Sequence, residues 1–299
     1  MVTYLRSVET NYSMETLLRT IGKTRQQYYQ SKKRFDEKTK DEQKILDLVR
    51  NWREVHPRMG SRTMYYSLLE QGVNLVVGVN RFERLLSEND MTVGKIKRSG
   101  PYTSDGKGKG DHPNLTNGLE LSSINQLVVS DITYIWIKNR WYYLFTLKDV
   151  YSQRLVSLIP SEDMKATHVL ATLVELEKLR GKEELKGCIY HSDNGSQYEW
   201  GVFLSSISTL EMQVSRAETC QQNGSAEQLN HILKNMYLKH YGIASFSDLQ
   251  RACKEVKDLM NEKRSVSQLG NTTVSKFEKS LYDIPMDQRI VKKMYDFKT

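Results

Sequence analysis

Hydrophobic residues recur every three to four positions through the first part of the chain, a spacing that predicts amphipathic helices. Helices are expected at 14–20, 25–33, about 36–55, 62–70 and 80–88. After a polar stretch, apolar and β-branched residues form short runs bounded by turn residues, which predicts strands. The chain is therefore expected to begin with an all-helical region and to continue as an α/β domain.

The first two helices form a helix-turn-helix pattern. Ser13 and Thr24 are suitable N-cap residues, and Gly22 interrupts the run between the two helices. The second helix is rich in donors that reach base edges and phosphates: Arg25, Gln26, Gln27, Tyr28, Lys32, Lys33 and Arg34. An ordinary amphipathic hairpin with a solvated basic face has the same pattern and stays open as the alternative.

Three segments precede the expected α/β domain. Residues 1–55 hold the helix-turn-helix and a connecting helix. Residues 56–93 are expected to form a second small DNA-binding unit, with Arg81 and Arg84 exposed and with Arg62 and Arg81 as candidate DNA contacts. A purely structural helical unit is an equal alternative there. Residues 94–120 are rich in Gly, Lys, Ser and Asn and form a basic linker, in which Lys97 and Arg98 are candidate phosphate contacts.

The segment 121–285 has the order of an α/β domain, followed by a tail at 286–299. Strands are expected at 127–137, 141–149, 154–160, 187–191 and 212–215, with helices at 166–180, 198–207, 225–240 and 247–262. Three antiparallel strands and then alternating helices and strands would form a mixed five-stranded sheet with flanking helices. An RNase H-like domain has this order, but the pattern alone leaves other α/β folds open.

The charge of the chain favours a polyanionic partner. The 299 residues carry a net charge of +8, and the first 120 hold 21 Lys and Arg against 15 Asp and Glu. The positive excess therefore lies mainly in the helical region, as is typical of a nucleic-acid-binding segment attached to a more neutral domain. The three cysteines stand singly, which argues against a disulfide framework or a zinc module. With no signal peptide or membrane-spanning run recognised, a cytoplasmic protein is expected.

Three carboxylates are the candidates for catalysis. Asp131 lies within an apolar strand, Asp193 follows the fourth strand, and Glu227 lies in the first turn of a helix. Carboxylates from two strands and a helix can converge on hard cations such as Mg²⁺. Each also has a structural explanation: a hydrogen bond at a strand end, a turn aspartate, and an acid that complements a helix dipole. The residues alone leave these alternatives open.

Four ordered motifs resemble the integrase-core transposases of bacterial insertion sequences. They are SDITYI at 130–135, YLFTLKDVYSQRLVS at 143–157, HSDNGSQY at 191–198 and NGSAEQLNHILKNMYL at 223–238. HPRMGSR at 56–62 and KTRQQYY at 23–29 are similar to the front end of that family. The resemblance covers nearly the whole chain and implies an RNase H-like core preceded by a helix-turn-helix region.

The resemblance implies a role for each matching position. Asp131, Asp193 and Glu227 match a metal-binding triad for two Mg²⁺ ions, with Mn²⁺ as a substitute. The residues that match the loop shaping the site are His191, Ser192, Gly195, Ser196 and Gln197. Asn223 matches the asparagine before the glutamate helix, and Lys234 matches a lysine that holds DNA phosphate. Among these, Gln197, Asn223 and Lys234 are expected DNA contacts.

The implied reaction is metal-dependent cleavage at the ends of a mobile element, followed by transfer of the freed 3′-hydroxyl to another phosphodiester. The implied partners are the inverted-repeat ends, target DNA and further copies of the chain, at least as a dimer. An upstream frameshift partner and association with the nucleoid are further expectations. A catalytically silent DNA-binding regulator is the alternative, and an RNase H-like ribonuclease is a third.

The sequence departs from the family pattern in three places. The Asp193–Glu227 interval is about two residues shorter than usual, where roughly 35 residues intervene, and the loop at 215–219 is expected to account for the difference. Gln153 stands where Ser-Arg is usual in the hairpin. The Pro-His pair of the usual tail is replaced near Arg264. None of these changes touches the three carboxylates.

Overall fold

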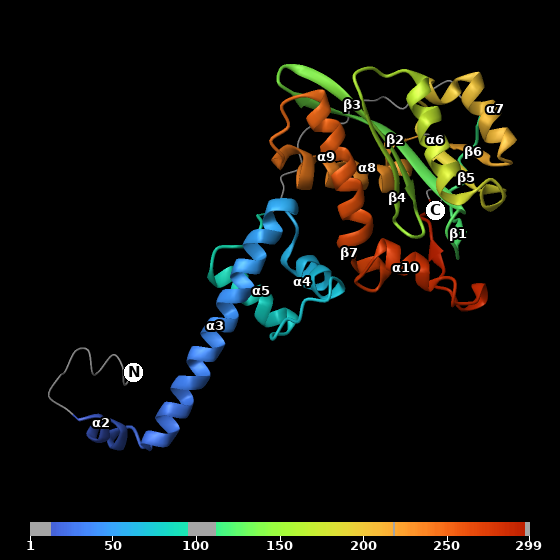
Figure 1. Cartoon of the computed structure of the whole chain (residues 1–299). Helices are drawn as coiled ribbons and strands as arrows, with labels where there is room; N and C mark the ends of the chain where they lie inside the picture. The colour runs from blue at the N-terminus through green and yellow to red at the C-terminus, as the bar shows by residue number, and fades with distance from the viewer. Residues whose placement is uncertain (1–12, 95–111, 218, 297–299) are drawn as a thin grey trace. The chain divides into compact units, whose positions relative to one another are not determined.

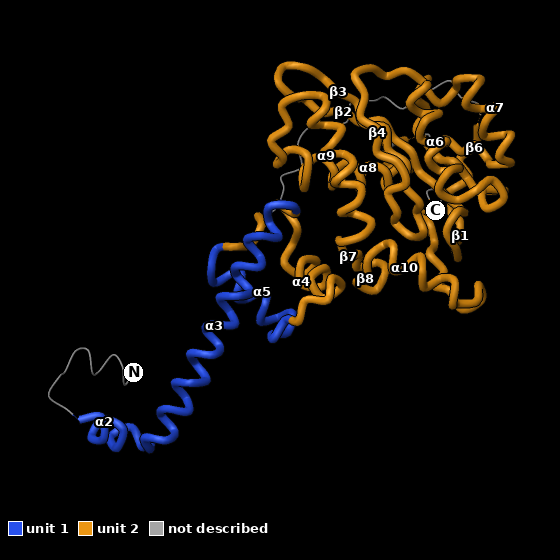
Figure 2. Tube along the Cα trace, viewed as in Figure 1, with its two compact units in different colours: residues 1–55, 75–90 blue, residues 56–74, 91–299 orange. Residues whose placement is uncertain are grey.

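The computed structural model describes residues 13–94, 112–217 and 219–296, and the chain divides into two compact units (Figure 2). Unit 1 comprises Met1–Val55 and Leu75–Asp90, and unit 2 comprises His56–Asn74 and Met91–Thr299. The segment 56–93, expected as a separate helical unit, contributes one helix to each. No helix in the described ranges has the length and apolar character to cross a membrane.

Unit 1 contains three helices within its described residues: α2 (Met14–Thr20), α3 (Arg25–Val55) and α5 (Val79–Glu88). The expected N-caps are confirmed. Ser13 Oγ accepts from the Thr16 amide at 3.2 Å, while Thr24 and Gln27 form a reciprocal capping box with bonds of 3.2 and 3.0 Å. Gln27 therefore caps α3 as well as standing on its basic face.

The prediction of a break between two helices near residue 34 was wrong, because α3 is continuous. No Gly or Pro interrupts the sequence there. The (i, i+4) ion pairs Lys33–Glu37 at 4.0 Å and Lys38–Glu42 at 3.8 Å add a few tenths of a kcal/mol each, roughly 0.3–0.5. The helix therefore continues through the charged segment between residues 33 and 42.

Unit 2 is built on a mixed sheet that has, within the described residues, the strand order β4-β3-β2-β5-β6 (Figure 1). Its strands are β2 (Leu127–Ile137), β3 (Arg140–Asp149), β4 (Leu155–Ser161), β5 (Ile189–Ser192) and β6 (Gln213–Arg216). Strands β2, β3 and β4 are antiparallel, whereas β5 is parallel to both β2 and β6. The predicted mixed five-stranded sheet of an RNase H-like domain is confirmed.

Helices cover both faces of the sheet. The first face packs against α6 (Ala166–Arg180) and α7 (Gly201–Thr209), with Val128, Phe145 and Leu173 in the core. On the opposite face, Val129 and Ile189 pack with Ala226 of α8 (Gly224–Ile232) and with the segment around α10 (Val274–Ser280). Successive residues of β2 thus enter different cores, as the two-residue period of a strand requires.

The remaining elements of unit 2 complete its edges. Helix α4 (Ser61–Glu70), α9 (Phe246–Asp258) and the short strands β1 (Glu120–Leu121), β7 (Ser265–Val266), β8 (Thr272–Thr273) and β9 (Lys292–Lys293) belong to it. Single turns lie at Glu183–Leu185, Ser196–Glu199, Cys220–Asn223, Leu238–His240, Ser267–Leu269 and Met286–Gln288, and π-helical turns at Leu233–Tyr237 and Leu259–Lys263. The predicted single helix at 225–240 therefore ends at Ile232, where a π-helical turn replaces it.

Helix α4 is joined to the C-terminal part of unit 2 by a small hydroxyl network. The Ser265 amide donates to Ser67 Oγ at 2.9 Å, and Ser265 Oγ donates to the Thr63 carbonyl at 3.1 Å. Ser67 and Ser265 are both buried. Helix α4 starts at Ser61 with Gly60 as its N-cap, one residue before the start expected from the sequence.

A side-chain amide occupies the outer edge of the sheet. Strand β4 is the last strand on its side, and Asn261 of the second π-helical turn packs against it. The Leu155 amide donates to Asn261 Oδ1 at 3.0 Å, and Asn261 Nδ2 donates to the Leu155 carbonyl at 2.9 Å. The buried Asn261 therefore satisfies two backbone groups that a neighbouring strand would otherwise take.

Candidate active site

The register between β2 and β5 places two of the candidate carboxylates on one face of the sheet. Val129 is aligned with His191 in this parallel pair. Two residues farther along each chain come Asp131, within β2, and Asp193, directly after β5. Because side chains alternate along a strand, both aspartates emerge on the face that carries Val129. This is the face covered by α8.

Helix α8 brings the third carboxylate to the same place. The helix packs against β2, and Asn230 Nδ2 donates to Asp131 Oδ2 at 2.6 Å. Glu227 precedes Asn230 by three residues, so the two side chains share one face of α8. Glu227 is half-buried and contributes to the electrostatic field at Asp131. The structure thus gathers the three predicted acids at the junction of β2, β5 and α8.

The electrostatics of this junction favour a cation. Burial, the charge of Asp193 and the charge of Glu227 together raise the pKa of Asp131 from 3.8 to about 7, against the opposing effects of the Ile132 amide and Lys234. Burial also raises the pKa of both Asp193 and Glu227. Three partly desolvated carboxylates repel one another when ionised, and a bound cation would relieve that repulsion.

The donor set fits a hard divalent metal in kind, because all three side chains offer carboxylate oxygens. Across the described ranges, however, no three His, Cys, Asp or Glu side chains are already arranged to hold one ion together. One oxygen of Asp131 is engaged by Asn230 and the other by the Ile132 amide at 2.9 Å. The acids are therefore gathered by the fold, but their side-chain rotamers are set by hydrogen bonds within the protein.

The loop after β5 fixes the position of Asp193. The Gly195 amide donates to Asp193 Oδ1 at 3.1 Å. A Cβ at position 195 would lie 3.1 Å from that oxygen and 3.1 Å from Gln197 Oε1, so a side chain there would press on both. Gln197 is half-buried, and Ser196 is exposed. Glycine at 195 therefore permits the close turn that holds the aspartate.

Arg216 is a buried residue at this site that the motif comparison did not single out. Its side chain is 1 % exposed and joins both ends of the loop: Nη1 donates to Ser192 Oγ at 3.2 Å, Nη2 to the Tyr198 carbonyl at 2.9 Å, and Nε to Glu199 at 3.0 Å. The sequence offered one signal for this role: Arg216 directly follows the predicted buried strand 212–215, and a guanidinium buried there requires hydrogen-bond partners.

His191 and Asn223 have structural contacts beneath the acids. Burial lowers the pKa of His191 to about 4, so the ring is neutral. Its Nε2 lies 3.3 Å from the Gln222 carbonyl, which fixes the proton there, and its Nδ1 lies 2.8 Å from Ser215 Oγ. Asn223 is 4 % exposed and donates to the Ser130 carbonyl at 3.2 Å. The predicted DNA contact at Asn223 therefore lies behind the surface.

A small cavity adjoins these two residues. It has a volume of about 160 Å³ and is lined by Thr116, Val129, His191, Gln221, Gln222, Asn223, Gly224, Ser225, Met294 and Tyr295. Within the described part of the chain, Asn223 Oδ1 has no hydrogen-bond partner.

Lys234 lies at the free edge of β2. Its Nζ donates to Thr133 Oγ1 at 2.8 Å and is 3.4 Å from the Tyr134 carbonyl oxygen. Burial, followed by the charge of Lys239, lowers the pKa of Lys234, while the charge of Asp131 opposes this. The structure therefore places this lysine beside the carboxylates, as the family resemblance implied for its position.

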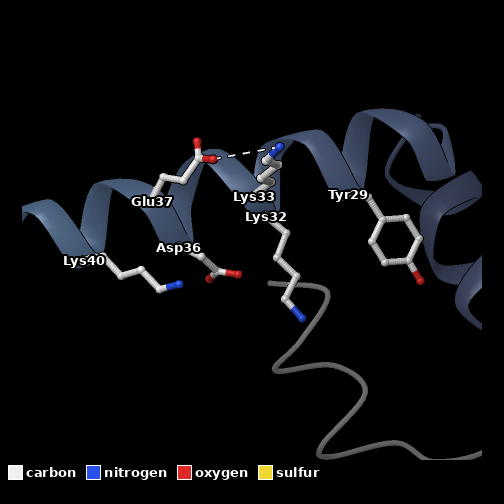
Figure 3. Close-up of a pocket in the computed structure, with 6 residues that line it drawn as sticks. All are labelled: Tyr29, Lys32, Lys33, Asp36, Glu37 and Lys40. Atoms are coloured by element: carbon white, nitrogen blue, oxygen red, sulfur yellow. Dashed lines mark ion pairs between the residues drawn. The ribbon is translucent and has the colours of Figure 1, made fainter.

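The expected DNA contacts on α3 lie in unit 1 on an exposed helix surface. Arg25, Gln26, Lys32 and Lys33 are exposed, and Tyr28 is half-buried. Figure 3 shows the surface formed by Tyr29, Lys32, Lys33, Asp36, Glu37 and Lys40, where Lys33 pairs with Glu37. Tyr29, Lys32, Asp36 and Lys40 point to the same side. The surface mixes three lysines with two acids, so its positive charge is partly offset.

The remaining expected contacts have different fates. Arg62 is exposed on α4 in unit 2. Arg81, expected to be exposed, is half-buried and pairs with Glu42 at 2.7 Å and Glu88 at 2.8 Å, because α5 packs beside α3 in unit 1. These two ion pairs raise the pKa of Arg81. Lys97 and Arg98 lie outside the described residues.

Comparison with known proteins matches this site to an integrase core. Residues 122–221 match the family model of the integrase core domain. Along 90% of this chain and 99% of its own length, the uncharacterized 31 kDa protein of insertion element IS600 from Shigella sonnei is 28% identical. The transposase for insertion sequence element IS629 from Shigella sonnei is 25% identical, covering 86% of each chain.

Among solved structures, the HTLV-2 integrase catalytic core domain in complex with magnesium is similar at a TM-score of 0.43 and 17% identity, over 52% of this chain and 97% of its own. A similarity with such a low TM-score and identity supports no conclusion beyond the strand order described above. The match of residues 122–221 and the two insertion-element relatives support the same class of protein. The chain is therefore similar to bacterial insertion-sequence transposases over most of its length and contains a match to the integrase core domain.

Proposed function

We propose that this transposase cleaves and joins DNA at a site formed by Asp131, Asp193 and Glu227. The observation that carries the proposal is the gathering of the three acids on one face of the sheet, where burial and mutual charge raise the pKa of Asp131 to about 7. A structural explanation of each acid separately does not account for three like charges at one junction of an integrase core.

An integrase core implies dependence on a divalent metal, and we propose Mg²⁺ as that metal, bound as two ions, with Mn²⁺ as a substitute. The three carboxylates would hold it. Bound there, the metal supplies activation of water or a 3′-hydroxyl and stabilisation of the leaving oxygen. The acids must be ionised to bind it, so cation binding and loss of the proton from Asp131 are coupled.

The other residues of the site position these acids. Asn230 holds one oxygen of Asp131, and the Gly195 amide holds one oxygen of Asp193. Arg216 fastens the loop on which Asp193 stands. The neutral ring of His191 joins β5 to β6 through Ser215, and it joins β5 to the segment before α8 through the Gln222 carbonyl. These contacts restrict the motion of the carboxylates relative to a bound substrate.

DNA is the substrate, and several copies of the chain are expected to act together. We propose that the substrate is the inverted-repeat ends of the element together with target DNA, held by at least a dimer. In unit 1 the basic surface of α3, with Arg25, Gln26, Tyr28, Lys32 and Lys33, would bind the ends. In unit 2, Gln197 and Lys234 would contact the substrate near the acids, and Arg62 would contact DNA from α4. An upstream frameshift partner and a nucleoid-associated, cytoplasmic location complete the proposal.

The test uses purified full-length protein and labelled duplexes taken from the DNA that flanks the gene. With Mg²⁺ the wild type should nick the element ends and join them to target DNA, whereas Asp193→Asn and metal-free wild type should bind the ends without product. Binding by the wild type with no metal-dependent product would leave a silent regulator as the function. Cleavage of an RNA–DNA hybrid in preference to duplex DNA would indicate a ribonuclease.

A further inference from the structure

The β2–β3 hairpin, whose strands are labelled in Figure 1, carries an exposed aromatic cluster close to its turn. Tyr134, Trp136 and Trp141 are 40, 51 and 48 % exposed, and we call these three residues the aromatic platform. Large aromatic side chains left at the surface in contact with one another are characteristic of binding sites. The core does not use them, so the platform invites a functional explanation.

The hairpin geometry fixes the platform. Lys138 and Asn139 both have positive φ, of 42° and 64°, as a two-residue turn between twisted strands requires. Trp136 and Trp141 are cross-strand partners, with ring centroids 4.7 Å apart, and Tyr134 packs edge-on against Trp141 at 5.1 Å. The three rings therefore form one preassembled surface on one face of the hairpin.

The platform and the carboxylate site lie on opposite faces of β2 and meet at its edge. Tyr134 and Trp136 are three and five residues beyond Asp131, about 10 and 17 Å along the strand at the usual rise, and these odd separations place them on the face that Asp131 does not occupy. Within the described residues, β5 pairs with β2 only over Leu127–Val129, so the β2 edge beyond Asp131 is not covered by β5. Lys234 reaches along this edge and lies 5.2 Å from the centre of the Tyr134 ring.

The charge around the platform suits a nucleic acid. Lys234 lies over the Tyr134 ring and its charge acts on Asp131, and the exposed Lys138 lies in the hairpin turn. Aromatic faces flanked by cations are the combination that binds unpaired nucleotides, since bases stack on the rings and phosphates contact the cations. In a paired duplex the base faces are already stacked and only the edges are accessible.

We propose that the aromatic platform stacks unpaired bases of the DNA bound at the carboxylates, where that DNA crosses the edge of β2 beside Lys234. This inference rests on the proposed function, because only a DNA substrate at the acids brings bases to the hairpin. The platform would thereby hold a locally opened DNA end during cleavage or joining.

The experiment measures binding in EDTA, so that it does not depend on catalysis. Full-length protein is titrated with two fluorescent DNA ends of identical sequence, one fully paired and one with unpaired nucleotides at its terminus. The Trp136→Ala/Trp141→Ala double variant should lose on the order of tenfold in affinity for the unpaired end, about 1.4 kcal/mol, and less than twofold for the paired end. The Trp136→Phe/Trp141→Phe double variant, which keeps aromatic rings at both positions, should retain most of the preference for the unpaired end.

Two controls separate stacking from general damage. Tyr282→Ala removes an aromatic side chain that is 86 % exposed elsewhere and should change neither affinity. Abasic nucleotides at the unpaired positions should abolish the preference of wild-type protein, which tests the proposal without any substitution. Quenching of tryptophan fluorescence by the unpaired end should be lost in the double alanine variant.

Equal loss on both DNA ends, or an unchanged preference with abasic nucleotides, would overturn the platform. A double variant that keeps its DNA preference but loses self-association in sedimentation would assign the platform to contact between copies of the chain and overturn it as well. Failure of metal-dependent cleavage with an intact preference for unpaired ends would instead count against the proposed catalysis, so the two proposals fail separately.

Discussion

Asn230 of α8 donates a hydrogen bond of 2.6 Å to Oδ2 of Asp131 on β2. The bond joins the helix that carries Glu227 to the strand that carries Asp131, so it fixes the spacing of two of the three acids. Its donor is a neutral amide, which stabilises the ionised carboxylate without adding a competing charge.

Replacing Asn230 should impair catalysis more than folding. Asn230→Ala removes the donor and frees the Asp131 side chain to rotate, and we expect metal-dependent cleavage to fall by about tenfold or more, as is usual when a group that orients a metal ligand is lost. Single-turnover cleavage of a labelled element end measures the effect. The matched variant Gln228→Ala, exposed on the same helix, should stay near wild type. A rate in Asn230→Ala equal to that of the control would contradict an orienting role.

The stability of metal-free protein should depend on Asp131 in a defined pH window. A carboxyl whose folded pKa is raised from 3.8 to about 7 binds more protons when folded than when unfolded. The free energy of unfolding from this group therefore falls as pH rises through that window and stays low above it. Asp131→Asn should raise the Tm at pH 8 by a few degrees and have a smaller effect at pH 5, where only part of that loss is present.

Thermal unfolding in EDTA at the two pH values checks this expectation, with the exposed Glu177→Gln on α6 as a control whose effect should be the same at both. Adding Mg²⁺ or Mn²⁺ should raise the Tm of the wild type and leave that of Asp131→Asn unchanged. A variant less stable than the wild type at pH 8 would show that the charged carboxylate is a net structural contributor.

Arg216 should be important for stability because it is buried and joined to three partners. Arg216→Met leaves Ser192, the Tyr198 carbonyl and Glu199 without their donor. We expect a loss of about 2–4 kcal/mol in the free energy of unfolding, measured by urea denaturation. Arg251→Met breaks a pair whose arginine is 75% exposed, and it should cost less than about 1 kcal/mol. A similar small loss at both positions would mean that water replaces the Arg216 contacts.

Arg25 tests the recognition surface of unit 1. It is exposed at the start of α3, and its ion pair with Glu15 at 3.7 Å is also exposed. Arg25→Ala should weaken binding to element ends more than binding to random duplex, by about 1–3 kcal/mol if it reads a base. Lys44→Ala, on the same helix and also exposed, should weaken both equally or not at all. Equal losses for Arg25→Ala would make it a phosphate contact only.

The sequence predicted those parts of the fold in which local pattern and tertiary packing agree. Strand β2 and helix α6 have the expected bounds, because the two-residue and four-residue periods there match the cores that they enter. The prediction that Asp131, Asp193 and Glu227 share one site came from the ordered motifs. The hydrophobic pattern alone does not show that strands 127–137 and 187–191 are paired.

The differences arise where long-range contacts decide. The run after Ile232 contains no helix breaker before Gly242, yet the helix widens into a π-turn where Lys234 bonds Thr133 and Tyr237 bonds His56 at 3.1 Å. The sequence predicted an exposed Arg81, whereas the packing of α5 against α3 places its guanidinium beside Glu42. Such contacts join residues far apart in sequence, which periodicity does not register.

The Asn261 amide at the margin of β4 bears on how copies of this transposase can assemble. An open strand margin is a template on which another chain can add a strand, and this is a common route both to oligomers and to aggregates. Here the side-chain amide occupies the backbone groups of Leu155, and α9 packs along the same strand. Strand addition at this end of β4 is therefore blocked, so copies of the chain do not join here through a shared sheet.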